Sequence, residues 1–282
     1  MHALGELRLW STLRHRLGSL LETQPGSYTS KREDVTHPSV AIGQLDSRKV
    51  SIEISQESFR HFLIFVIGTL LSLAALSYVF VDLTGHDTVL GIMPLLDVGK
   101  EQSIATFFSI FNILAASVLS FFIYRAEKLK ESPLNLYWLL LSMLLFYMAL
   151  DESATIHEKL IHPHEYFFGD SLPMIPSHGW MLMGAMLASL VGLAFLPFLF
   201  ALPRRTAVLF VTAGSIFLLG ALGLEFVSAW MVSTGLADYT YLVNRLPVLL
   251  EEGCEMSGVA ILNCALLREL VEKKIVLTLR GA

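Results

Sequence analysis

The segment LNLYWLLLSMLLFYMAL, residues 134–150, runs without a break into the acidic segment DESATIHE, residues 151–158. A helix needs about 20 apolar residues to cross a bilayer, and the first segment nearly meets that length. The second segment places carboxylates and an imidazole at the C-terminal end of that helix. Carboxylates near hydrocarbon depth are costly unless they are paired, protonated or bound to a cation, so we interpret these residues as functional candidates.

The composition of the whole chain is that of a membrane protein. Of its 282 residues, 54% are hydrophobic and 16% are charged, whereas soluble domains carry about 25% charged residues. The mean hydropathy is +0.60. The net charge of −5 gives no reason to expect nucleic-acid binding. Cys254 and Cys264 lie about 15 Å apart along one predicted helix, which excludes a disulfide between them.

Six segments are apolar enough to span about 30 Å of hydrocarbon as helices. They are residues 61–83, 103–124, 134–153, 178–201, 206–230 and 246–267. We therefore predict an all-α polytopic membrane protein with six transmembrane helices. Lys and Arg concentrate on alternate connecting segments, and the positive-inside rule then places both termini in the cytoplasm. We expect the protein to lie in the inner (plasma) membrane of a bacterium.

The chain divides into three predicted regions. Residues 1–59 form a cytoplasmic N-terminal extension, in which leucines recur at near-helical spacing over residues 4–21 and a polar linker follows. Two interpretations of residues 4–21 are open. The segment is an amphipathic helix that binds the membrane surface or a partner protein, or it is a loosely structured tail. Residues 60–270 form the six-helix transmembrane domain, and residues 271–282 form a cytoplasmic tail. Within that domain, Gly184, Ala188 and Gly192 form a predicted small-residue seam for close helix packing.

Acids and histidines gather at one predicted depth. Counting about 1.5 Å per residue from the cytoplasmic boundary places polar residues of five spans near the outer hydrocarbon edge. The candidate metal or proton sites are Glu101, Asp151, Glu152, His157, Glu158, His178, Glu225, Glu251, Glu252 and Glu255.

Helical spacing indicates which of these residues share a face. Asp151 and Glu158 nearly eclipse each other if their helix continues past the membrane edge, whereas Glu152 and His157 diverge from them. Under that condition Asp151 and Glu158 can share an inward face, and one member of the Asp-Glu pair would coordinate. The remaining carboxylate of the Asp-Glu pair would cap the helix, face water, or pair with Lys159 or Arg245.

Three glutamates of the last span admit two interpretations. Glu255 lies three residues after Glu252 and four after Glu251, so it can share a helix face with either carboxylate. Alternatively, Glu251 and Glu252 lie in the first turns of the span and merely complement the helix dipole.

A carboxylate layer of this kind needs positive charge from protons, a basic partner or a metal. Carboxylates with imidazole suit zinc, iron or manganese, whereas oxygen ligands alone suit calcium. The Glu-x-x-His spacing of two-metal helical bundles is absent, because Glu152 and His157 are five residues apart. We therefore treat a divalent metal ion as a candidate cofactor, with protons as the alternative.

The sequence resembles a widespread group of bacterial multispan membrane proteins. The resemblance rests on a Leu-Asp-Glu…Ile-His-Glu motif in residues 150–158, on Glu101 before an Ile-Ala-Thr-Phe-Phe-Ser helix start, and on Glu-Glu-x-x-Glu in residues 251–255. It covers roughly residues 97–268 and implies shared architecture and a shared polar layer. A fainter similarity is to the alkaline ceramidase and adiponectin receptor superfamily, whose zinc-binding His-x-x-x-His pair would correspond here to residues 251–255.

Three classes of function remain open from the sequence. In the first class, the carboxylate layer binds a divalent cation or protons, and the protein is a carrier, a sensor or a cation-dependent assembly component. In the second class, the chain is a non-catalytic accessory subunit of a larger membrane complex, and its acidic residues pair with residues of a neighbouring subunit. The third class is a metal-dependent hydrolase acting on a lipid, with His157 or His178 as acid-base partner. The expected partners are the lipid bilayer and either other membrane subunits or further copies of the chain. The residues do not decide whether the protein is an enzyme.

Overall fold

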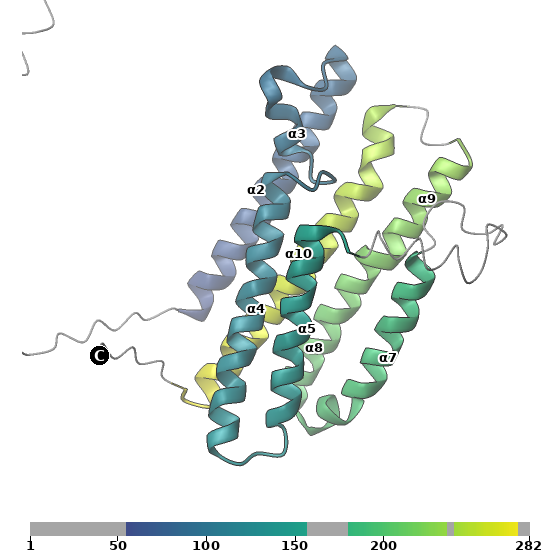
Figure 1. Ribbon diagram of the computed structural model, residues 1–282. Helices are drawn as coiled ribbons and strands as arrows, with labels where there is room; N and C mark the ends of the chain where they lie inside the picture. Colours follow the sequence, from purple (N-terminus) through teal and green to yellow (C-terminus); the bar gives the residue numbers. More distant parts are fainter. Residues whose placement is uncertain (1–54, 157–179, 236–239, 276–282) are drawn as a thin grey trace, which may run out of the picture. The chain divides into compact units, whose positions relative to one another are not determined.

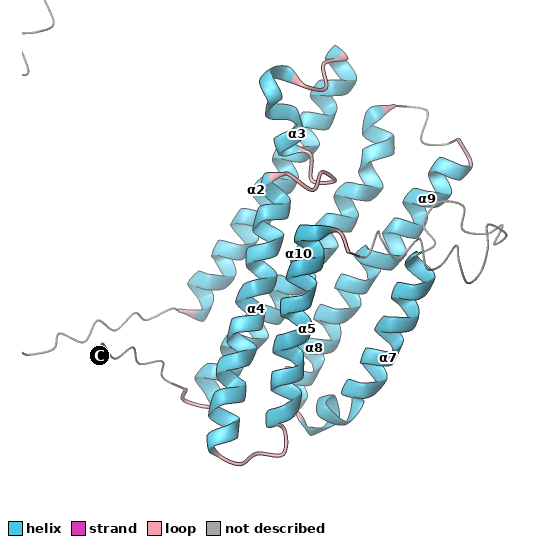
Figure 2. Cartoon of the chain, in the orientation of Figure 1, coloured by secondary structure: helices cyan, strands magenta, loops and turns pink. Residues whose placement is uncertain are grey.

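The computed structural model describes residues 55–156, 180–235 and 240–275 (Figure 1). Every regular element in these ranges is helical, as Figure 2 shows, which confirms the all-α prediction for this part of the chain. The N-terminal extension up to residue 54 lies outside the described residues, and so do His157, Glu158 and His178.

The helices follow one another through short connections. They are α2 (Gln56–Thr84), η1 (Val89–Gly91), α3 (Ile92–Leu96), α4 (Ile104–Leu129), α5 (Asn135–Ala154), α7 (Trp180–Ala201), α8 (Arg204–Leu218), η3 (Leu219–Leu224), α9 (Glu225–Ser233) and α10 (Tyr241–Glu272). The N-terminal residue types explain where several begin. Ser55, Ser103 and Thr240 each accept a backbone N–H from the first turn of α2, α4 and α10. α8, the π-helical turn η3 and α9 follow one another without interruption.

Five helical segments are long and apolar enough to cross a membrane. They are Gln56–Thr84, Ile104–Leu129, Asn135–Ala154, Met183–Ala201 and Arg204–Met231. Large apolar side chains on them are exposed, such as Phe65 at 72% and Phe200 at 85%, as expected for surfaces that face lipid. The described helices therefore have the length and apolar surface of a multi-pass membrane protein. The predicted sixth span, 246–267, is not among the five because Glu251, Glu252 and Glu255 interrupt it, so six spans and cytoplasmic termini stay predictions.

α10 is the central helix of the described bundle. It packs against α2, α4, α8, η3 and α9, and in Figure 1 it passes behind α4 and α5. α4 and α5 pair closely with each other. Ser117 Oγ donates to the Ser142 carbonyl at 2.8 Å, and Ser142 Oγ donates to the Ser117 carbonyl at 2.9 Å. Reciprocal bonds of this kind hold helices together where apolar surroundings supply no other partner.

Glycines bring α10 unusually close to the α8–η3 segment. A Cβ at Gly258 would lie 2.8 Å from the Ala213 carbonyl oxygen and 2.8 Å from the Phe217 nitrogen, and a Cβ at Gly220 would lie 2.7 Å from the Glu251 carbonyl oxygen. The predicted seam on α7 is wrong at Gly192, which is exposed and has no atom within 4 Å of its Cβ position. The close helix contact therefore lies between α8 and α10.

Aromatic side chains fill the space between α5, α7 and α8. Trp138 is fully buried, with its ring 4.9 Å from the ring of Phe198 and 6.0 Å from that of Phe210. Both pairs are edge-to-face, the arrangement that aromatic quadrupoles favour. This cluster holds α7, which is otherwise largely exposed, against the bundle.

We expect Gly258→Ala to destabilise the protein by about 1–3 kcal/mol, because the new methyl group meets backbone atoms of α8 that cannot move aside. The matched control is Gly192→Ala, which adds a methyl group in open space and should be neutral or stabilising by about 0.5–1 kcal/mol. Thermal unfolding in detergent measures both. Equal midpoints for the two variants would contradict the close contact.

Candidate functional site

Five glutamates from three helices form what we call the carboxylate cluster. Its members are Glu152 of α5, Glu225 of α9, and Glu251, Glu252 and Glu255 of α10. Glu255 lies within electrostatic reach of the other four members, and Glu252 within reach of Glu152 and Glu251. The structure therefore brings together five of the ten predicted site residues, from segments about a hundred residues apart in the chain.

The remaining predicted residues are not in this cluster. Glu101 is exposed in the turn before α4, and Asp151 is partly buried near the end of α5. Neither charge is among those that act on Glu252 or Glu255.

The condition under which Asp151 and Glu158 would share a face, a helix that continues past the membrane edge, is not met. α5 ends at Ala154, and Thr155 adopts a left-handed conformation with φ 47° and ψ 48°. α5 therefore ends before Glu158, which lies outside the described residues, so the seven-residue helical spacing does not relate it to Asp151. Glu152 is the α5 carboxylate whose charge acts on Glu252 and Glu255.

The helix-dipole interpretation of Glu251 and Glu252 is also wrong. α10 begins at Tyr241, several residues earlier than the predicted span, and so these glutamates lie beyond its second turn. The field of a helix terminus acts within the first turn only. Sequence analysis missed the extension because Pro247, inside α10, resembles a helix start.

The π-helical turn η3 leads directly into Glu225. Gly220, in that turn, lies against the α10 backbone at Glu251, and its Cβ position is 3.0 Å from Glu255 Cγ. A larger residue would push α9 away from α10. π-helical turns inside α-helices occur frequently at functional sites, and this one leads into the α9 member of the cluster, Glu225, whose charge acts on Glu255.

Two carboxylates of the cluster have no cationic partner among the described residues. Within the described ranges, no hydrogen bond or ion pair reaches the carboxylates of Glu252 and Glu255, and the charges that act on them are other carboxylates. No three His, Cys, Asp or Glu side chains in the same ranges are arranged to hold a metal ion. The predicted metal ligation therefore stays a prediction, with His157, Glu158 and His178 outside the described residues.

A buried ion pair that the sequence did not reveal lies beside the cluster. Asp97 is 3% exposed and pairs with Arg245 of α10 at 3.2 Å. Tyr78 donates to its Oδ1 at 2.7 Å, the Gly99 N–H donates to Oδ1 at 3.2 Å, and Tyr241 donates to Oδ2 at 3.4 Å. We call these residues the Asp97 network.

Four donors thus satisfy the Asp97 carboxylate, whose charge also acts on Glu252, though less than those of Glu152 and Glu251. Arg245, which the sequence allowed as a partner of the Asp151-Glu152 pair, is paired with Asp97 in the structure. Tyr241 precedes the predicted span, and burial, followed by the Asp97 charge, raises its pKa above the ordinary 10.0. The hydroxyl therefore stays protonated and available as a donor.

Asp82 of α2 caps the start of α10. Its two carboxylate oxygens accept the backbone N–H groups of Tyr241 and Leu242 at 2.8 and 3.1 Å. These N–H groups have no partner within their own helix, and a carboxylate also complements the positive end of the helix dipole. Asp82 and Asp97 together fix the first turns of α10 against α2.

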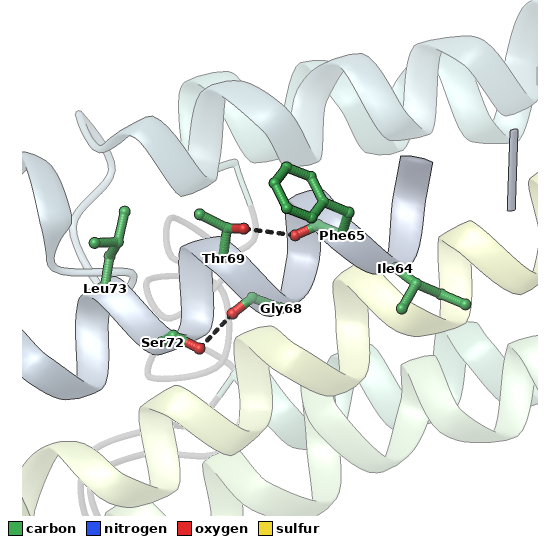
Figure 3. A pocket seen from close by; sticks show the side chains of 6 residues that line it. All are labelled: Ile64, Phe65, Gly68, Thr69, Ser72 and Leu73. Carbon is green, nitrogen blue, oxygen red and sulfur yellow. Dashed lines mark hydrogen bonds between the residues drawn. The ribbon is translucent and has the colours of Figure 1, made fainter. Parts of the chain in front are cut away.

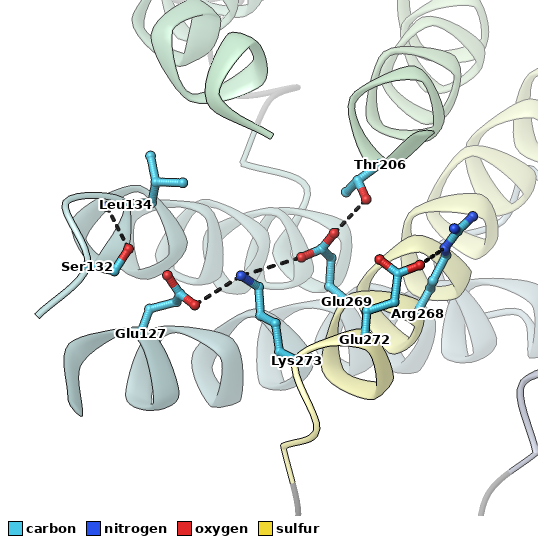
Figure 4. A network of polar contacts seen from close by, with 8 residues as sticks. All are labelled: Glu127, Ser132, Leu134, Thr206, Arg268, Glu269, Glu272 and Lys273. Carbon is cyan, nitrogen blue, oxygen red and sulfur yellow. Dashed lines mark hydrogen bonds and ion pairs between the residues drawn. The ribbon is translucent and has the colours of Figure 1, made fainter. Parts of the chain in front are cut away.

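The opposite end of α10 carries a second buried network, which we call the Lys273 network (Figure 4). Lys273 Nζ lies 3.0 Å from Glu127 Oε1 of α4 and 3.8 Å from Glu269 Oε2. Thr206 of α8 donates to Glu269 Oε1 at 2.5 Å. Glu127 and Glu269 are 6% and 2% exposed. Arg268 and Glu272 form a separate, more exposed pair at 2.7 Å.

A shallow hollow on α2 offers no comparable chemistry (Figure 3). It is lined by Ile64, Phe65, Gly68, Thr69, Ser72 and Leu73. The two hydroxyls of this set donate to backbone carbonyls of their own helix, Thr69 to Phe65 and Ser72 to Gly68. The hollow therefore presents apolar groups to the surroundings.

We expect Arg245→Gln to destabilise the protein by about 3 kcal/mol, because it leaves Asp97 buried without its cation. This is the low end of the usual range, since the Arg245 side chain is 22% exposed. The control Arg60→Gln removes an exposed pair with Glu57 and should cost less than about 1 kcal/mol. Thermal unfolding with both variants tests this, and an effect of Arg245→Gln no larger than that of the control contradicts it.

Comparison with known proteins gives a family but no activity. Residues 63–270 match a family described as a domain of unknown function, DUF8692. No curated protein and no solved structure matches the chain, so the similarity to the ceramidase and adiponectin receptor superfamily stays a prediction. The matched range contains the carboxylate cluster and the Asp97 network, and it ends just before Lys273. Because the match covers well over half of its length, the chain belongs to the DUF8692 family.

Proposed function

We propose that this chain is a multi-pass membrane protein whose carboxylate cluster takes up protons in a carrier or sensor role. One observation supports it above the others: Glu252 and Glu255 are surrounded by like charges and have no cation partner among the described residues. Like charges in a low-dielectric site repel strongly, and a proton is the smallest species that removes the repulsion.

The position of the cluster supports a transport or sensing role over a purely structural one. Structural carboxylates of this protein are paired, as Asp97 is with Arg245 and Glu127 is with Lys273. The five glutamates of the cluster come from α5, α9 and α10, so a change in their charge acts on three helices at once. Ionisable groups inside membrane bundles commonly serve proton relays or ion pathways.

A divalent cation is the second candidate occupant. Carboxylates from three helices that converge on one place could supply oxygen ligands to such an ion, with histidine ligands favouring zinc, iron or manganese over calcium. Two other functions would use the same carboxylates. In an accessory subunit they would pair with a basic residue of another subunit, and in a metal-dependent lipid hydrolase they would hold the catalytic metal. The experiments below separate these uses.

The test of proton uptake is pH-dependent infrared difference spectroscopy on the purified protein in lipid nanodiscs. We expect a carboxyl signal that changes with pH and that is lost in Glu255→Gln, because the amide cannot exchange a proton. The matched control is Asp87→Asn, which removes an exposed carboxylate outside the cluster and should leave that signal in place. A wild-type signal that survives in Glu255→Gln contradicts the proposal.

Elemental analysis of the same samples distinguishes the metal. One outcome is one equivalent of zinc, iron, manganese or calcium that Asp87→Asn retains and Glu255→Gln loses. That result would identify the metal, and not protons, as the species bound by the cluster. If the metal were also required for lipid turnover, the result would support the metal-dependent hydrolase over a carrier or sensor. Metal-free protein with the infrared signal supports proton uptake.

A further inference from the structure

The segment that connects α2 to α4 carries large apolar side chains that the protein leaves uncovered. We call residues 79–96 the α2–α3 hairpin; they comprise the last turns of α2, a short turn, η1 and α3. Figure 1 shows α3 beside the last turns of α2, against which it packs. The exposed apolar residues include Leu83, Leu90, Ile92 and Leu95. The last three lie outside every helix that is long enough to cross a membrane, so apolar surface continues from α2 onto a segment that does not span.

Leu90 is both exposed and strained. Its backbone has φ 55° and ψ 19°, in the left-handed region that glycine or asparagine occupies at a lower cost than leucine. Its side chain is 96% exposed, so it gains almost nothing from packing within the chain. Both costs are offset if a surface outside the chain removes this side chain from water.

The length of α2 places the hairpin at one boundary of the hydrocarbon. Glu57 and Arg60 form an exposed ion pair near the start of α2, and such charges lie outside the hydrocarbon. A hydrocarbon thickness of about 30 Å corresponds to about 20 helical residues, so the hydrocarbon that begins after Arg60 ends near Phe80. The headgroup layer adds about 5–8 Å on each side. Leu83 lies about 4.5 Å beyond Phe80 along the helix, and therefore within that layer.

A hydrogen bond fixes the level of α3 relative to α2. Tyr78 donates to Asp97 Oδ1 at 2.7 Å, and Asp97 directly follows α3 as its C-cap. The five residues of α3 rise about 7.5 Å, so Ile92 lies no further than that from the level of Tyr78 along the bundle. Leu83 is the same distance from Tyr78 along α2. Ile92 and Leu95 are three residues apart and share one face of α3, so this exposed face lies at the level of the membrane interface.

The tip of the hairpin is polar, in contrast to the residues that follow it. Gly85, His86, Asp87 and Thr88 are all exposed. The apolar residues come after this tip, on the part of the chain that returns toward Asp97. A segment that presents polar groups to water and apolar groups to the acyl chains is typical of binding at a membrane interface. The order of residue types along the hairpin therefore agrees with its level in the membrane.

We propose that the α2–α3 hairpin is an interfacial anchor, whose exposed leucine and isoleucine side chains insert among the lipid headgroups and the adjoining acyl carbons. Bilayer lipid is the partner, because the exposed surface continues the lipid-facing surface of α2 and lies at the level of the interface. The anchor does not depend on proton uptake by the carboxylate cluster. Since Asp97 directly follows α3 and pairs with Arg245, the anchor also holds the start of α10 at a constant depth.

Spin-label accessibility tests the anchor on the full-length protein in nanodiscs of phosphatidylcholine and phosphatidylglycerol. A label is attached at Leu90→Cys or at Leu95→Cys in a background with Cys254→Ala and Cys264→Ala. Its collision rate with oxygen, which concentrates in lipid, is compared with its collision rate with a water-soluble nickel chelate. We expect the oxygen-to-nickel ratio at both positions to be several-fold higher than at the matched control Asp87→Cys, which lies in the polar tip of the same hairpin.

Two results would overturn the anchor. A ratio at Leu90→Cys and Leu95→Cys no higher than at Asp87→Cys means that the hairpin stands in water. Low collision rates with both reagents at the two positions mean that a protein surface, from another copy of the chain or from another subunit, covers the hairpin in place of lipid. The labelled side chains are exposed, so we expect each variant to unfold at a midpoint close to that of the unlabelled background. A bimane label at Leu90→Cys gives a second measurement, since lipids brominated near the top of the acyl chain should quench it, and absence of quenching contradicts the anchor.

Discussion

The rest of the structure depends on the polar anchoring of α10. Inside a membrane bundle, a buried polar group that lacks a partner destabilises the fold, so each such group on α10 restricts where the helix can lie. Asp82 and Asp97 hold its first turns, the Asn112–Asn263 pair holds its middle, and Glu127 holds its last turn through Lys273. Translation of α10 along its axis would break all three sets of contacts together.

This anchoring explains how an unfavourable cluster of carboxylates can persist. Glu252 and Glu255 lie between the first and second anchors, and Gly220 and Gly258 press α8 and η3 against the same stretch of α10. The repulsion among the glutamates therefore cannot be relieved by moving the helix away. It can be relieved by uptake of positive charge, which is the physical basis of the proposed function.

The sequence predicted the apolar part of this structure better than its polar contacts. Apolar runs located the helices within a few residues, as for 61–83 against Gln56–Thr84, because hydrophobic length alone specifies them. The depth count also placed Glu225 at about the height of Glu152, and both charges act on Glu255 in the structure. The Asp97–Arg245 pair was missed because it joins segments almost 150 residues apart with no local pattern. The sequence left open which of Asp151 and Glu152 faces inward, because nothing in it marks the left-handed turn at Thr155. The small-residue seam was predicted on α7 because glycine spacing does not name the partner helix.

The central claim is that carboxylates of α5, α9 and α10 share one site. Short bifunctional thiol cross-linkers test it most directly, in a background with Cys254→Ala and Cys264→Ala. We predict cross-links for the pairs Glu152→Cys with Glu252→Cys and Glu225→Cys with Glu255→Cys, because the charges of each pair act on one another. A control pair, Glu152→Cys with Glu272→Cys at the far end of α10, should give none. Absence of cross-links in both test pairs, in folded protein, would contradict the shared site.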